Sequence, residues 1–236
     1  MQHHRPRVLE RFSSFWWGDK GLSAQLALLT FAFLFAPLLD SAVGQVLSSA
    51  FFSLFILSGV ATISDKRRHR IGAGIVAFIT FLLTWLEHVF PDNTPLLTAA
   101  AAATFCYMVL LTGVVLWHVF KDGTITTSRV LGAIVAYVLI GLTWAGLYQL
   151  VDLIIPGSMS VSTAVGEQNA FQREKDFIYF SFVTLTTTGY GDITPLLPTA
   201  RVFMIIEALI GQLFPATLLA RLVSLQGVRR EPDGDA

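Results

Sequence analysis

Six long apolar runs divide this chain of 236 residues, and each is long enough to cross a lipid bilayer as a helix. The hydrocarbon core of a bilayer is about 30 Å thick, which takes roughly 20 helical residues to span. Only 14% of the residues are charged, whereas about 25% is usual for soluble domains. The sequence therefore predicts an all-α membrane protein whose transmembrane helices cover residues 22–39, 43–63, 71–90, 96–120, 130–155 and 199–225.

The basic residues gather on one side of this six-span arrangement. All but three of the 16 Lys and Arg precede the first span or follow the second, fourth and sixth, and the exceptions are Arg173, Lys175 and Arg201. Positive charge is retained on the cytoplasmic side of a membrane. We therefore expect a multi-pass protein of the plasma (cell inner) membrane with both termini in the cytoplasm.

The stretch before the first span also has a periodic pattern. Aliphatic and aromatic residues recur at near-helical spacing among Arg7, Glu10 and Arg11, and Trp16 and Trp17 follow. This pattern is typical of an amphipathic helix in the membrane interface. A frayed tail and a cleaved signal peptide are the alternatives.

A short segment between the fifth and sixth runs is too brief to cross the membrane. Residues 177–185 are predicted to form a helix of two to three turns, with Asp176 as its N-cap. Such a helix would dip into the bilayer and return. Backbone at that depth cannot leave its carbonyl groups unpaired in lipid, so it must line a polar cavity.

The residues after this short helix suit a ring of backbone carbonyls. Four copies of residues 187–191 around one axis would stack carbonyl oxygens that replace the water around a dehydrated ion. Gly189 and Gly191 reach backbone angles denied to other residues. Thr187 adds a ring of hydroxyls, and Tyr190 is expected to point away and pack against the pore helix.

The segment TTTGYGD at residues 186–192 resembles the selectivity filter of potassium channels, and the resemblance covers about residues 130–225. It implies a re-entrant pore helix and filter between the fifth and sixth helices of a homotetramer. It further implies potassium sites, with no organic cofactor, formed by the Thr187 hydroxyl and by carbonyls of the residues Thr187, Thr188, Gly189 and Tyr190, with Gly191 completing the filter.

Several neighbours of the filter are candidates for its support. Some family members carry a carboxylate where this chain has Val183, and that carboxylate binds the aspartate after Gly-Tyr-Gly. Asp192 must therefore find another partner here, and Tyr179 matches an aromatic position that supplies one in the family. We hypothesise that a Tyr179–Asp192 hydrogen bond braces the filter, together with Thr186.

The sixth run resembles the inner helix of the same family. Gly211 matches the usual glycine hinge and Pro215 follows one turn later, so together they predict a gating bend. Close helix packing and a static kink are the alternatives. Gln212 is expected to face the cavity. Glu207 is a rare carboxylate within a span, so a functional or paired role is the default expectation.

The first four runs lack the charges of a voltage sensor, because the fourth has no Lys or Arg before Lys121. They are interpreted as an assembly shell or a sensor of another stimulus. Glu87, His88 and Asp92 form either a proton or cation sensor or a solvated loop. His118 is expected to be a packing residue.

The sequence thus predicts an interfacial helix at 1–21, a four-helix bundle with a voltage-sensor-like layout at 22–120, a potassium channel pore domain at 129–225 and a short cytoplasmic tail at 226–236. The favoured function is passive, potassium-selective conduction, in contact with lipid and without nucleic acid. A cation-uptake transporter subunit and a non-conducting scaffold are alternatives. An enzyme has little support. The single cysteine, Cys106, is expected to be a small buried hydrophobe.

Overall fold

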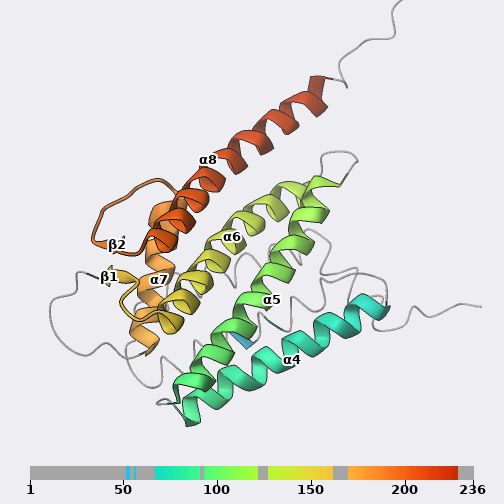
Figure 1. The fold of residues 1–236 in the computed structure, drawn as a ribbon. Coiled ribbons are helices and arrows are strands. Elements are labelled where there is room, and N and C mark those ends of the chain that lie inside the picture. The colour runs from blue at the N-terminus through green and yellow to red at the C-terminus, as the bar shows by residue number, and fades with distance from the viewer. Residues whose placement is uncertain are drawn as a thin grey trace, which may run out of the picture.

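The computed structural model describes residues 52–53, 56, 67–90, 93–121, 127–161 and 170–227. The interfacial helix, the first span and nearly all of the C-terminal tail lie outside these residues, and only 52, 53 and 56 represent the second span. The described elements are α4 (Arg67–Val89), α5 (Thr94–Phe120), α6 (Thr127–Ile154), β1 (Met159–Val161), α7 (Ala170–Leu185), β2 (Ile193–Pro195) and α8 (Pro198–Gly227) (Figure 1).

Three of the described helices are long and apolar enough to cross a membrane. They are α5, the part of α6 from Arg129 and the part of α8 up to Arg221. The apolar stretch of α4 is shorter and covers Ile71–Glu87. The predicted third to sixth runs are therefore helical, and the described part of the chain is mainly α-helical, as expected of an all-α membrane protein.

Local sequence explains where α5 begins. The side chain of Asn93 accepts a hydrogen bond from the backbone N–H of Leu96 at 3.1 Å, and Pro95 stands in the first turn. A side-chain oxygen satisfies one of the free N–H groups at a helix start, and proline tolerates the first turn because it has no N–H to leave unpaired. Asn93 and Pro95 thus mark the start of α5.

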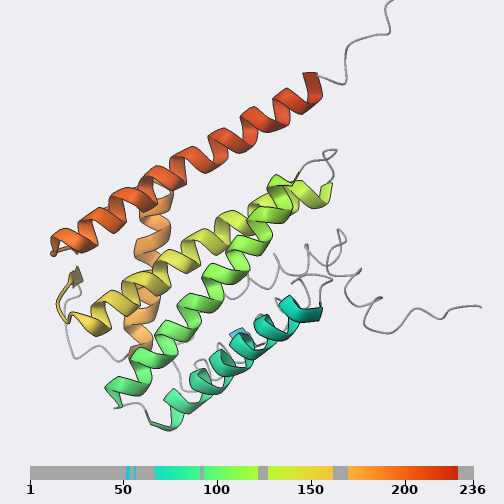
Figure 2. The same cartoon turned by 45° about the vertical axis from the view of Figure 1, so that its right-hand side comes forward.

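The helices pack side by side in the order α4, α5, α6, with α8 on the far side of α6 (Figures 1 and 2). Fully buried side chains from α5 and α6 form the core between them, among them Tyr107, Leu111, Val135 and Leu139. The hydroxyl of Tyr107 donates to the carbonyl of Ile56 at 2.7 Å. Helix α5 therefore packs on helix α6 within one chain.

A small sheet that was not predicted joins the segment after α6 to the segment before α8. β1 and β2 pair antiparallel, with Met159 opposite Pro195 and Val161 opposite Ile193. β2 begins directly after residues 186–192, the filter segment. The ladder therefore joins the end of the filter segment to the chain that follows α6.

Candidate functional site

Helix α7 crosses between α8 and α6, and its C-terminal end carries the filter segment (Figure 2). It has 16 residues and is therefore about 24 Å long, which is short of the roughly 30 Å hydrocarbon core. The predicted N-cap at Asp176 is wrong, because the helix begins at Ala170 and Asp176 lies inside it. The polar residues before Asp176 continue the helix, and polarity alone does not end one.

The aromatic side of α7 faces helix α6. Phe177 and Phe180 are buried, and the ring of Phe180 meets that of Tyr148 edge-on with centroids 4.9 Å apart. Edge-to-face contacts are a favoured arrangement of aromatic rings. This packing sets α7 against α6 before the chain reaches the filter.

The backbone of the filter segment alternates in the sign of φ. Thr187, Gly189 and Gly191 have φ of 58°, 59° and 80°, and Thr188 and Tyr190 do not share this positive sign. The prediction that both glycines adopt angles unsuited to other residues is confirmed. Thr187 was not predicted to do so, because a threonine rarely takes a positive φ. The alternation lets successive peptide groups point the same way, as a ring of carbonyls requires.

The N–H groups at the start of this segment complete the end of α7. Thr187 N donates to Thr184 O at 2.9 Å, and Thr188 N donates to Val183 O at 2.9 Å. They satisfy carbonyls that a helix end otherwise leaves unpaired. Among the described residues, no main-chain hydrogen bond ends on a carbonyl oxygen of residues 187–190. Those oxygens remain available to another partner.

The side chains of the filter segment are exposed in the single chain. The Thr186 and Thr188 hydroxyls lie 2.9 Å apart, and the Thr186 hydroxyl also donates to Phe182 O at 2.7 Å. Tyr190 is 72% exposed. The packing of Tyr190 on the pore helix is therefore not seen among the described residues and stays a prediction.

Asp192 has the partner that the sequence indicated. The hydroxyl of Tyr179 donates to Asp192 Oδ2 at 2.7 Å, and Ile193 N donates to Asp192 Oδ1 at 3.1 Å. The hydrogen bond to Asp192 raises the pKa of Tyr179 to about 12, so the phenol keeps its proton at neutral pH and acts as donor. Val183 is half-buried. The bracing role of this bond stays a prediction.

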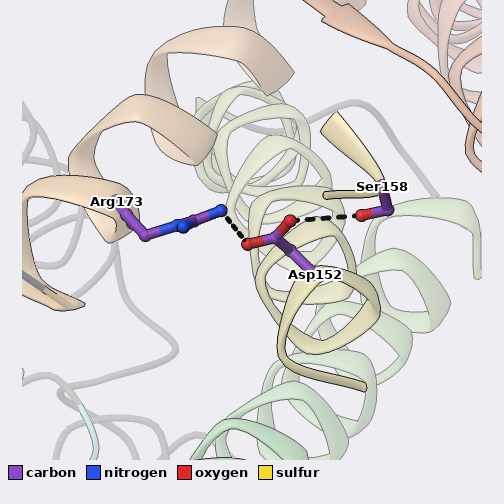
Figure 3. A network of polar contacts seen from close by, with 3 residues as sticks. All are labelled: Asp152, Ser158 and Arg173. Carbon is purple, nitrogen blue, oxygen red and sulfur yellow. Dashed lines mark hydrogen bonds and ion pairs between the residues drawn. The ribbon is translucent and has the colours of Figure 1, made fainter. Parts of the chain in front are cut away.

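A second polar network, the Asp152–Arg173 network, ties the C-terminal end of α6 to the N-terminal part of α7 (Figure 3). Asp152, near the end of α6, is 6% exposed and pairs with the guanidinium of Arg173 on α7. The hydroxyl of Ser158 donates to the other carboxylate oxygen at 3.3 Å. Sequence reasoning missed this site, although a carboxylate at the end of an apolar run was the available signal.

Gly211 lies against the end of the pore helix. A Cβ at this position would come within 1.9 Å of the carbonyl oxygen of Leu185, so only glycine allows this approach. The contact supports the packing alternative for Gly211. Pro215 lies inside α8 and Gln212 is exposed in the single chain. A gating bend and a cavity position for these residues stay predictions.

Glu207 has two hydrogen-bond donors that the sequence did not identify. Its side chain is fully buried between three helices. Oε2 accepts from the Tyr148 hydroxyl at 2.6 Å, and Oε1 lies 2.5 Å from the Ser181 hydroxyl. The expected paired role of Glu207 is confirmed, and its partners come from α6 and α7.

The other candidates of the N-terminal half gain little support. Asp92 and the side chain of His88 lie outside the described residues, so their clustering with Glu87 is not tested. Within the described part of the chain, no group of three or more His, Cys, Asp or Glu side chains is arranged to hold a metal. The expectation of a buried Cys106 is wrong, because it lies beside the buried residues of α5 rather than among them and is exposed.

Residues 150–226, about a third of the chain, match a protein-family model described as "Ion channel". The chain is 53% identical over 49 residues to "Two pore potassium channel c" of Oryza sativa subsp. japonica, which is 21% of this chain and 11% of that protein. It is 41% identical over 64 residues to "Protein LctB" of Geobacillus stearothermophilus, covering 27% of this chain and 46% of that protein.

A third relative gives a similar result. "Two-pore potassium channel 5" of Arabidopsis thaliana is 43% identical over 49 residues, which is 21% of this chain and 12% of that protein. The chain thus spans less than half the length of each of these relatives. Together with the apolar helices, the matches identify an ion channel region in a membrane protein and point away from an enzyme.

Proposed function

We propose that this chain is one subunit of a potassium-selective channel, which conducts K⁺ passively through a homotetrameric pore. One observation carries the proposal. The segment 186–192 follows the end of a short helix with φ alternating in sign, and the described residues leave its carbonyls without donors. The match to ion channels over the same region supports it.

In this proposal the ion is the cargo and the chain supplies its coordination. The carbonyl oxygens of Thr187, Thr188, Gly189 and Tyr190, with the Thr187 hydroxyl, take the place of water around K⁺. Gly191 completes the segment. The C-terminus of α7 points its partial negative charge toward the entering cation. No organic cofactor has a role.

Assembly from four chains follows from what one chain cannot do. A single filter segment offers one side of an ion site, and its Tyr190 side chain is 72% exposed in the described structure. Helix α8 also leaves a row of large apolar side chains exposed, which includes Val202, Ile205, Leu209 and Leu213. In a tetramer this row meets neighbouring chains and lipid.

The same proposal places the chain in the plasma membrane with cytoplasmic termini and without a voltage sensor. Helix α5 occupies the place of the fourth span and has no Lys or Arg between Thr94 and Phe120. Charges must cross the membrane field to drive voltage-dependent opening. A bend of α8 near Pro215, one turn after the close contact of Gly211 with Leu185, opens the inner mouth in this proposal.

The test is recording from purified full-length protein in planar bilayers under K⁺ and Na⁺ gradients. The reversal potential should shift by about 59 mV for each tenfold change in the K⁺ ratio and should ignore Na⁺. Gly189→Ala, which forces a side chain into a positive-φ position, should abolish selective current. A wild-type reversal potential that follows both ions would refute the proposal.

A further inference from the structure

Three helices meet at one hydroxyl in the middle of the pore region. The Ser181 oxygen on α7 lies 2.7 Å from the carbonyl oxygen of Gly141 on α6 and 2.5 Å from Oε1 of Glu207 on α8. Tyr148, also on α6, donates to the other oxygen of Glu207 at 2.6 Å. Ser181, Tyr148 and Glu207 are each fully buried.

A second contact layer lies one helical turn further along all three helices. The carbonyl of Leu185, four residues after Ser181, accepts from the hydroxyl of Tyr137 at 3.2 Å. The same carbonyl lies against Gly211, four residues after Glu207. Residues four apart lie on one face of a helix. The two layers therefore fix both the position of α7 along α8 and its rotation.

The second layer ends one residue before the filter segment, which starts at Thr186. Any change in the depth or rotation of α7 thus moves the first filter residues directly. A buried carboxyl group is costly unless its oxygens are bonded, and both oxygens of Glu207 have hydroxyl partners here. An apolar residue of similar size would fill the space without setting the register.

We propose that Glu207 is a positioning residue for permeation. Through Ser181 and Tyr148 it holds the pore helix at the depth at which the filter carbonyls coordinate K⁺. We name Gly141, Tyr148, Ser181 and Glu207 the three-helix clamp. This inference rests on the proposed function, because its consequence is measured as ion selectivity.

The decisive comparison is Glu207→Gln against Glu207→Leu. The glutamine oxygen can accept from Tyr148 while its NH₂ group donates to Ser181, which leaves the serine hydrogen for Gly141 O. Leucine fills a similar volume and makes neither bond. Tetramer content is measured by size-exclusion chromatography with light scattering, and the K⁺/Na⁺ permeability ratio by bi-ionic reversal potentials.

Glu207→Gln should keep the permeability ratio within about threefold of wild type, whereas Glu207→Leu should lower it roughly tenfold or more, as loss of outer-shell support does at other ion sites. An assembled Glu207→Leu tetramer with the wild-type K⁺/Na⁺ permeability ratio would refute the positioning role of Glu207. A wild type without selectivity would overturn the proposed function and the clamp together, so the two failures are distinguishable.

Single hydroxyl deletions cover the case in which Glu207→Leu fails to assemble. Tyr148→Phe and Ser181→Ala each remove one partner of Glu207 and should lower the permeability ratio. Combined, they should change it by less than the product of their separate effects, because both act through one carboxyl group. Tyr107→Phe also removes a buried tyrosine hydrogen bond, but one made by α5 to Ile56 and not by a member of the clamp, and it should leave the ratio unchanged. Wild-type ratios in both single variants would contradict the proposal.

Discussion

Two regions of this chain, the helices α4 to α6 and the surroundings of α7, are held together by different means. Between α4 and α5, and between α5 and α6, buried apolar side chains form the core, with Tyr107, Leu111 and Leu139 among them, and a few hydroxyl hydrogen bonds lie beside it. Around α7, by contrast, single atoms meet at defined distances, as Ser181 and Glu207 do. An apolar interface tolerates small shifts, whereas a hydrogen bond between buried groups does not. In the proposed channel, the part that has to place carbonyl oxygens precisely is the part that contains these directional contacts.

Gly211→Ala should produce the largest effect and tests the comparison most directly. The added methyl group would meet the Leu185 carbonyl at 1.9 Å, and backbone cannot move aside cheaply there. We expect a loss of about 3 kcal/mol or more, seen as loss of the assembled tetramer on size-exclusion chromatography. Gly113→Ala on α5 meets nothing within 4 Å and is the matched control. Equal behaviour of the two variants would remove the contrast between the regions.

Arg173→Met should have the next largest effect. It leaves the buried carboxylate of Asp152 without its charged partner, although Arg173 itself is 39% exposed and its pairing is partly screened. We expect a loss of about 2 kcal/mol, measured as a lower Tm of the purified protein. Arg201→Met removes a hydrogen bond to the neutral carbonyl of Pro195 and should cost less, about 1 kcal/mol. A smaller loss of stability in Arg173→Met than in Arg201→Met would argue against a stabilising role of the Asp152–Arg173 network.

Tyr179→Phe should change the kinetics of the filter without changing assembly. The hydrogen bond to Asp192 is absent in this variant, so current decay during sustained opening should alter a few-fold, as recorded in planar bilayers. Because the pKa of Tyr179 is raised to about 12, its protonated form and this bond persist below about pH 10 and are lost as the pH rises through 12. Wild-type decay should therefore be constant from pH 7 to about 10, as far as Tyr179 determines it. Identical decay in the wild type and Tyr179→Phe would dismiss the brace.

Tyr107→Phe should have the smallest effect and sharpens the comparison from the other side. It deletes the 2.7 Å bond from Tyr107 on α5 to Ile56 O, which precedes α4. The expected loss of stability is about 1 kcal/mol, measured by thermal unfolding, with no change in permeation. A change in ion selectivity in this variant would show that the N-terminal helices also position the filter.

The features that were predicted correctly from the sequence are those that depend on the residues of a single segment. Apolar runs predicted α5, α6 and α8, and Gly189 and Gly191 predicted the left-handed backbone because no other residue adopts it so readily. The pairing of Tyr179 with Asp192 was also predicted, on the basis of a resemblance. These features depend on residue type and spacing along a single segment.

Features that depend on contacts between distant segments were missed. Nothing local marks Ser181 as the partner of Glu207, because serine is common in helices and the two residues are 26 positions apart. The β1–β2 ladder joins three-residue strands too short to show an alternating pattern. The N-terminal extension of α7, residues 170–176, is mostly polar, and its Arg173 pairs with Asp152 of α6, which is distant in the sequence.

The ladder between β1 and β2 has a consequence for how this region can evolve. The seven residues from Thr186 to Asp192 run between two fixed anchors, the end of α7 and the start of β2. In β2, Ile193 and Pro195 face inward while Thr194 faces outward. Adding or deleting one residue between Thr186 and Asp192 would shift β2 by one position. The inward and outward positions of β2 would then be exchanged, and Thr194 would face the protein. The length of the segment from Thr186 to Asp192 is therefore constrained as well as its composition, and inserting one residue there should be as disruptive as replacing Gly189.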